Sequence, residues 1–254
     1  HNYSTLPQDD GRLTLAYSRI YDSQNQTVYL QVEEGGRVGD LYGTGYLKND
    51  KGDFILTNTG AYIADNNLQK LGNYNPDFML GFNNQFNYKN WDLSFLFDWR
   101  QGGIIVSRTK ALGNVGGQLA ETEYRPEGGI VPVGVVNVGT SENPVYEQNT
   151  VAVSAESYYR QFYDRNHEEN NTYDASFLKL RQFAIGYTFD KLTVFNQKAS
   201  LSLSLIGKNI FAITQNPHFD PEQLAVQGQG FVGGVEDMSY ATTKSFGFKA
   251  GFNF

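Results

Sequence analysis

The feature that most constrains this chain is a regular alternation of apolar and small polar residues over long runs. From Phe246 to Phe254 every second residue is Phe or Ala, and the residues between them are Gly, Lys and Asn. The same period of two occurs over 78–88, 91–100 and 199–205. Because successive side chains of a β-strand point to opposite faces, the pattern predicts strands with one apolar and one hydrophilic face.

The composition of these two faces separates a membrane β-barrel from a soluble β-sandwich. The inner face of a sandwich is usually of mixed aliphatic residues, whereas the apolar positions here are strongly aromatic and the others are Ser, Gly, Asn and Asp. The runs are close to the ~9–11 residues of a tilted membrane strand and longer than the ~5–6 residues of a common soluble strand. Aromatic residues near the run ends, such as Tyr88, Trp91 and Trp99, suit an interfacial girdle. We therefore expect an all-β chain that forms antiparallel strands of a transmembrane β-barrel.

A fifth run, at 174–189, alternates in the same way but changes phase. Leu178 and Leu180 fall on even positions, whereas Phe183, Ile185, Tyr187 and Phe189 fall on odd positions. Since a β-bulge inserts one extra residue and reverses the parity, we expect a bulge near Arg181 and Gln182, or a strand that leaves the membrane there.

Short and long connections alternate along the chain. Lys89-Asn90 joins two runs directly and 190–197 is a second short connection, whereas 102–173 and 211–242 are long. Outer-membrane barrels have short periplasmic turns and long extracellular loops. The two long connections are therefore expected to be extracellular loops.

The chain is expected to be the C-terminal part of a larger barrel. It begins with His1 instead of Met, and residues 1–76 are expected to add two or three strands that lead into the strands of 77–254. Too few strands are present for a closed barrel around such long loops, and an open barrel would expose sheet edges to lipid.

Composition excludes several functional classes. The formal charge of −7 and the pI near 5.0 argue against nucleic acid as the main partner. The absence of cysteine excludes disulfides, thiolate zinc sites and a cysteine nucleophile. No run reaches the ~20 apolar residues of a membrane helix. The three histidines lack metal-binding spacing, so we expect no metal, no cofactor and no catalytic residues.

Several motifs in order carry a resemblance to a known family. The pattern G-N-x-x-P-x-F, strand, Y-K-N, strand, R-x-G-G occupies 71–103, S-F-x-x-L-R lies in 173–189, and K-N-I-F followed by D-P-E lies in 205–222. With the Phe-ended strand at 243–254, this order resembles the C-terminal barrel of SusC/RagA-like TonB-dependent outer-membrane transporters of Bacteroidetes.

The resemblance implies a plugged barrel of about 22 strands that imports oligosaccharides or peptides. It implies three partners besides the lipid of the outer membrane: a SusD-like lipoprotein over the extracellular mouth, the energy-coupling protein TonB, which acts through an N-terminal part absent here, and the cargo itself. It does not distinguish glycan from peptide cargo. Two classes of alternative remain open: a secreted all-β carbohydrate-binding module without transport activity, and a barrel enzyme.

Two groups of side chains are candidates for binding. Asp92, Asp98 and Arg100 fall on the hydrophilic parity of one run, where they could line a transport path, pair with the plug or only be solvated. A second group within 157–165 combines tyrosine and arginine, which favour binding by stacking and forked hydrogen bonds, or which could pack the long loop upon itself. Its members are Tyr158, Tyr159, Arg160 and Tyr163. We read Asp220-Pro221-Glu222 as a structural turn in which Asp220 accepts hydrogen bonds from nearby amides.

Overall fold

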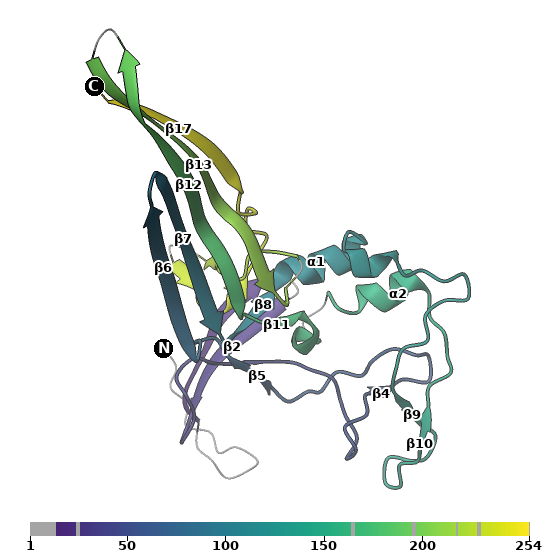
Figure 1. Ribbon diagram of the computed structural model, residues 1–254. Helices are drawn as coiled ribbons and strands as arrows, with labels where there is room; N and C mark the ends of the chain where they lie inside the picture. The colour runs from purple at the N-terminus through teal and green to yellow at the C-terminus, as the bar shows by residue number, and fades with distance from the viewer. Residues whose placement is uncertain are drawn as a thin grey trace. The chain divides into compact units, whose positions relative to one another are not determined.

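The computed structural model describes residues 14–23, 26–163, 166–194, 197–216, 218–227 and 230–253 (Figure 1). The chain divides into two compact units, each assembled from separate stretches of sequence. Unit 1 comprises His1–Asn75, Gly103–Asp174 and Glu222–Ser239, and unit 2 comprises Pro76–Gly102, Ala175–Pro221 and Tyr240–Phe254. Phe254, which the alternation assigns to the apolar face, lies outside the described residues.

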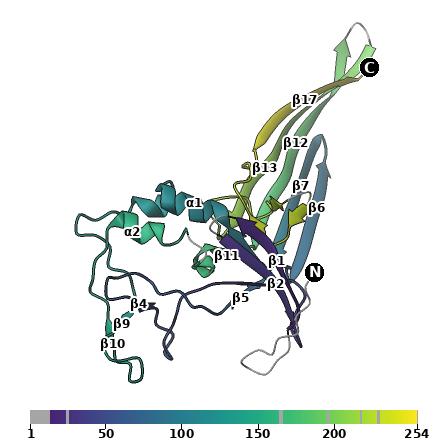
Figure 2. The same cartoon turned by 180° about the vertical axis from the view of Figure 1, so that it is seen from behind.

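Unit 2 is a single antiparallel sheet of five strands in the order β17-β13-β12-β7-β6 (Figures 1 and 2). Its strands are β6 (Phe78–Tyr88), β7 (Trp91–Gln101), β12 (Phe177–Val194), β13 (Gln197–Thr214) and β17 (Ser245–Asn253). The runs of alternating residues therefore form the expected strands. The connection expected at 190–197 is wrong in extent, because β12 continues to Val194 and β13 already begins at Gln197.

The register of unit 2 places most large apolar residues of the five strands on one face, and Met79, Leu96, Phe177 and Ile206 are exceptions that lie on the other. Residues opposite each other in an antiparallel pair share a face, and the alternating parities match from strand to strand. One row across the sheet pairs Phe82 with Phe97 and Phe97 with Leu180. We call this surface the apolar face. It contains Phe78, Leu80, Phe82, Phe86, Tyr88, Trp91, Leu93, Phe95, Phe97, Trp99, Leu178, Leu180, Phe183, Ile185, Tyr187, Leu201, Leu203, Leu205, Phe211, Ile213, Phe246, Phe248 and Phe252.

The predicted β-bulge is confirmed at Arg181. The pairing of β12 with β7 shifts between Leu180, which pairs with Phe97, and Gln182, which pairs with Leu96, so that Arg181 is the extra residue. On the other side, β13 has Asn209 and Ile210 opposite Arg181. The shift brings Leu180 and Phe183 onto the same face although their positions differ in parity. The tight turn is confirmed as well, since Tyr88 pairs with Trp91 across Lys89 and Asn90.

Unit 1 is built from short strands and short helices. Its strands form a sheet of order β1-β2-β3-β5, two smaller sheets of order β10-β9-β4 and β11-β8-β16, and the pair β14-β15. The strands are β1 (Thr14–Ser23), β2 (Gln26–Glu33), β3 (Asp40–Gly43), β4 (Ile55–Leu56), β5 (Gln69–Asn73), β8 (Ile104–Ser107), β9 (Val135–Asn137), β10 (Tyr146–Gln148), β11 (Thr172–Asp174), β14 (Ala225–Gln227), β15 (Gly230–Val232) and β16 (Val235–Glu236). The helices are α1 (Arg108–Gly116) and α2 (Ala155–Arg160), with 3₁₀ turns η1 (Ala120–Glu123) and η2 (Glu168–Asn171).

Two hydrophobic clusters stabilise unit 1. The first joins β2, β3, β8, β14, β15 and β16 through Val28, Leu41, Val106, Ala225, Val232 and Val235. The second contains Tyr46, Ile130, Tyr159 and Phe162. Two of the strands expected in 1–76 are present as β1 and β2, which pair as a hairpin. The segment from 39 to 48, expected as a third strand, forms only the short strand β3.

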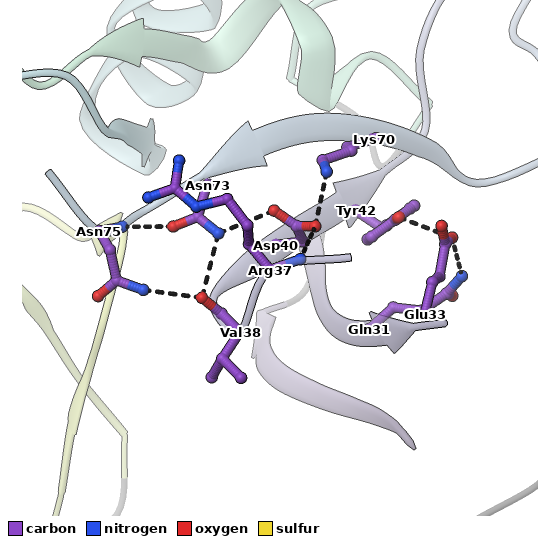
Figure 3. A network of polar contacts seen from close by, with 9 residues as sticks. All are labelled: Gln31, Glu33, Arg37, Val38, Asp40, Tyr42, Lys70, Asn73 and Asn75. Carbon is purple, nitrogen blue, oxygen red and sulfur yellow. Dashed lines mark hydrogen bonds and ion pairs between the residues drawn. The ribbon is translucent and has the colours of Figure 1, made fainter. Parts of the chain in front are cut away.

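A network of hydrogen bonds in unit 1 fixes the turn between β2 and β3 (Figure 3). We call it the clasp, and its members are Val38, Asp40, Lys70, Asn73 and Asn75. Asn73 and Asn75, both from the G-N-x-x-P-x-F motif, donate side-chain hydrogen bonds to the carbonyl oxygen of Val38 at 3.1 and 2.9 Å. Asn73 also donates to Asp40 Oδ1 at 2.8 Å, and Lys70 Nζ donates to Asp40 Oδ2 at 2.6 Å. The motif therefore fixes the turn that precedes β3 to the end of β5.

The carboxylate of Asp40 is the centre of the clasp and is almost fully buried. Burial alone would raise the pKa of Asp40, but the hydrogen bonds from Lys70 and Asn73 and from the Arg37 amide favour the charged form. The net effect is a lowered pKa. Asp40 thus remains charged at neutral pH although it is inside the protein.

The long connection 102–173 contains two helices that apolar periodicity did not indicate. Helix α1 begins after Ser107, whose side chain accepts a hydrogen bond from the Lys110 amide, and it ends at Gly117 in the left-handed conformation. Ser154 caps α2 by accepting from the Ser157 amide. These helices depend on their caps, which the search for alternation overlooked. No helix in the described part of the chain has the length and apolarity to cross a bilayer.

We predict that Gly39→Ala destabilises unit 1. Gly39 has a φ of 99°, and a Cβ atom there would lie 2.3 Å from Asn75 Nδ2. The strained backbone and the displaced clasp should together lower the free energy of unfolding by about 1–3 kcal/mol. Urea unfolding measures the effect. Gly128→Ala is the control, since its Cβ would meet open space, and equal stability of the two variants would contradict the clasp.

Candidate functional site

A pocket of about 700 Å³ in unit 1 contains two of the side chains selected from the sequence. Helices α1 and α2 lie side by side at this place (Figures 1 and 2). Tyr158 and Tyr159 from α2 line the pocket together with Lys110 and Asn114 from α1. The other walls come from η1 and the segment that follows it.

Tyr159 anchors the wall of the pocket. It is buried, and its hydroxyl lies 2.6 Å from the Glu121 carbonyl oxygen and 3.1 Å from that of Tyr124. Its ring meets that of Tyr158 edge to face, with centroids 5.1 Å apart. Burial raises the pKa of both phenols, and neighbouring Tyr158 and Glu121 raise that of Tyr159 further. Both side chains therefore stay neutral and act as hydrogen-bonding, apolar walls.

The ammonium group of Lys110 is bound by neighbouring groups of the same chain. Its Nζ donates to the Asn170 carbonyl oxygen at 2.6 Å and lies 4.6 Å from the centre of the Tyr173 ring. Burial lowers the pKa of Lys110, and the nearby Glu121 offsets part of that shift. The only other charged lining residue is Glu121, which is exposed at the mouth of the pocket.

The remaining members of the tyrosine and arginine group lie apart from this pocket lining. Arg160 is exposed and its Nη1 donates to Glu156 Oε1 one helical turn away, at 3.1 Å. Tyr163 is half-buried after the end of α2, where its amide donates to the Arg160 carbonyl. The geometry thus divides the predicted group into Tyr158 and Tyr159 at the pocket and Arg160 and Tyr163 beyond it.

A charged cluster occupies the hydrophilic face of the sheet in unit 2. Asp98 on β7 accepts two hydrogen bonds from Arg181 on β12, from Nη2 at 2.6 Å and from Nε at 3.1 Å. Also on β12, Lys179 forms an ion pair with Asp220, and both side chains are buried. On β7, Arg100 donates from Nε to the Gly102 carbonyl at 3.5 Å.

Asp220 has partners beyond the turn that the sequence suggested. The turn is present at Pro221 and Glu222, and the Asp220 carboxylate also pairs with Lys179 and accepts from Thr242 Oγ1 at 2.8 Å. The hydrogen bonds expected from nearby amides stay a prediction. Asp220 joins the D-P-E motif to the S-F-x-x-L-R motif of β12.

Asn114 and Glu121 are pocket residues that sequence reasoning missed. A possible signal for Asn114 is its place within a helix, since asparagine is unfavourable in helix interiors unless its side chain has a particular role. The described residues contain no group of three or more His, Asp or Glu side chains that could hold a metal ion.

Comparison with known proteins identifies relatives of one kind. No protein-family model matches the chain. TonB-dependent receptor P3 of Formosa agariphila is 26% identical over 221 residues, which cover 78% of this chain and 20% of the receptor. TonB-dependent receptor P39 of the same organism is 26% identical over 208 residues, which cover 80% of this chain and 18% of the receptor. The chain thus spans about a fifth of the length of the curated relatives that it matches.

A solved structure has the same fold. A chain of the RagAB peptide importer in its closed-closed state matches with a TM-score of 0.50 and 17% identity, over 95% of this chain and 28% of that chain. The receptors and this fold confirm the resemblance to SusC/RagA-like TonB-dependent transporters that the motifs indicated.

We predict that Asp220→Ala destabilises unit 2 by about 3 kcal/mol, because it leaves the buried Lys179 ammonium without this counter-ion. The double variant Lys179→Met with Asp220→Leu should recover most of the loss. Glu156→Ala, which breaks the exposed pair with Arg160, is the control and should cost less than about 0.5 kcal/mol. Urea unfolding in lipid vesicles measures all three, and a loss for Asp220→Ala no larger than for the control contradicts the role of the pair.

Proposed function

We propose that this chain is part of an outer-membrane importer of the TonB-dependent type, in which the sheet of unit 2 is a section of the barrel wall. The observation that carries the proposal is the apolar face, which is continuous across five strands. Many of its side chains are exposed within this chain, with Phe246 at 76%, Phe248 at 64% and Leu205 at 60%. So large an apolar patch needs a covering partner, and the hydrocarbon of a bilayer is one that fits an extended apolar surface.

The opposite face supports the same assignment. It holds the Asp98–Arg181 pair and the hydroxyls of Thr188 and Ser202, which lie 3.0 Å apart. Such a face suits the water-filled or plugged interior of a barrel. The strands β6 and β7 have eleven residues each, which is enough to cross the hydrocarbon core when tilted.

The edges of the sheet support a larger barrel. Strands β6 and β17 form the two edges, and their unpaired backbone groups cannot remain exposed in lipid. We infer that strands outside this sheet pair with both edges. The chain's short match to its relatives, about a fifth of their length, supports a whole protein with many more strands.

The proposed cargo and partners follow from the resemblance and from the alternation of short turns and long loops. With the Lys89-Asn90 turn on the periplasmic side, the connection 102–173 lies on the extracellular side. There it would meet the cargo and a SusD-like lipoprotein, while TonB would supply energy from the inner membrane. The RagAB neighbour is described as a peptide importer, which supports peptide over oligosaccharide cargo. The relatives are receptors and importers, and we propose no catalytic step.

Phe248→Arg should lower the stability of the inserted protein by about 2–4 kcal/mol, because it places a charge against lipid. Gly247→Arg is the matched control: it adds the same side chain one residue away on the hydrophilic face, where a Cβ meets open space. Folding into lipid vesicles from urea compares the two. Equal tolerance of arginine at both positions would contradict the lipid-facing assignment.

Transport is tested in cells that produce the full-length protein. Uptake of labelled peptides should require the protein, stop when TonB is removed, and continue for a small solute that passes porins. Purification in detergent should also recover a surface lipoprotein of SusD type. Uptake that persists without TonB, or a protein that is soluble without detergent, would contradict the importer and favour the secreted carbohydrate-binding module.

A further inference from the structure

We propose that the pocket of unit 1 is a binding site for one apolar residue of a peptide in an extended conformation, whose backbone amide pairs with Asn114. The inference rests on the proposed import function and assigns a place in this chain to its cargo. It starts from one buried side chain and from the chemistry of the walls around it.

Asn114 is only 2% exposed and lines the pocket. Neither its Nδ2 nor its Oδ1 has a hydrogen-bond partner in the part of the chain that the structure describes. A buried amide without partners is costly, and such groups are rare in native proteins. Asn114 thus offers one donor and one acceptor that remain to be satisfied.

The chemistry of a primary amide selects its partner. It donates through NH₂ and accepts through C=O, which is the complement of the C=O and N–H of a peptide group. A carboxylate could satisfy only the donor, and an ammonium only the acceptor. A neutral amide in the ligand therefore fits Asn114 better than a charged group.

The walls of the pocket favour an apolar side chain. Buried Ile130 and Phe162 lie deep among the lining residues, and Val131 and Val133 are exposed at the rim. A sugar would need several hydroxyl partners around its ring, whereas most lining groups here are aliphatic or aromatic. A ligand with a leucine-like side chain beside a peptide bond matches both the apolar walls and the Asn114 amide.

The negative charge of Glu121 at the mouth of the pocket affects which ligand residues can bind. Glu121 is exposed there, and the Lys110 ammonium is held by the Asn170 carbonyl and the Tyr173 ring. An acidic ligand residue would meet the like charge of the Glu121 carboxylate. The site should prefer neutral or basic residues next to the apolar one.

The test measures binding of blocked peptides to the full-length transporter purified in detergent. The probes are acetyl-Gly-Leu-Gly-amide, acetyl-Gly-Glu-Gly-amide and maltotriose, and isothermal titration gives each dissociation constant. We expect binding of the leucine probe to be at least tenfold tighter than binding of the other two. Asn114→Leu should weaken the leucine probe about tenfold, equivalent to about 1.4 kcal/mol, and should not lower the melting temperature, since it removes an unpaired amide.

Matched variants separate the pocket from general effects. Val133→Asp should weaken the leucine probe, whereas Val38→Asp, another exposed valine of unit 1, should leave it unchanged. Asn66→Leu is the exposed control for Asn114→Leu. Val133→Asp tests the pocket even if Asn114→Leu fails to fold.

Three results would overturn the proposal. They are an unchanged affinity of the leucine probe in both pocket variants, tighter binding of maltotriose that depends on Asn114, and tighter binding of the glutamate probe. Peptide uptake by cells is measured in parallel. If uptake still requires TonB while the probes fail to bind, only the pocket assignment is wrong; if uptake of every cargo is independent of TonB, the proposed import function is wrong.

Discussion

The extra residue at Arg181 is the constraint on which the sheet of unit 2 depends. Without it, the apolar residues before and after this point would lie on opposite faces, because strand side chains alternate strictly. The bulge keeps Leu180 and Phe183 on one face against both neighbouring strands. It also gives Arg181 a position from which two of its nitrogens reach Asp98 on β7. One irregularity thus preserves the apolar face and supplies an ion pair on the other.

The motifs of the chain lie mainly at junctions. Asn73 and Asn75 hold the turn before β3, and Gly102, with a φ of 76°, allows Asp77 to approach where a Cβ would be 2.3 Å from its Oδ2. Lys179 and Asp220 connect a strand to a distant loop through a buried ion pair. These positions need particular side chains or a missing Cβ, whereas the strands between them need only alternation.

The strands of unit 2 could be predicted because their signal is local. Alternation alone gave the faces, the tight turn at Lys89-Asn90 and the bulge at Arg181. Unit 1 was less predictable because its order comes from long-range contacts. Helix α1 depends on the caps at Ser107 and Gly117, and Glu236 is held by Ser107 and Thr109, more than a hundred residues away. Tyr158 and Tyr159 were selected for their type, but Asn114 and Glu121 meet them only through tertiary structure.

Some buried polar side chains in unit 1 have hydrogen-bond partners, and the Asn114 amide does not. Asp40 receives hydrogen bonds from Lys70, Asn73 and the Arg37 amide, and Glu236 receives them from Ser107 and Thr109. The side-chain amide of Asn114 has no hydrogen-bond partner within the described chain. An unpaired buried amide costs about 1–3 kcal/mol, and a ligand that satisfies it recovers this cost on binding. A ligand recovers this free energy in full only if it presents a donor and an acceptor together.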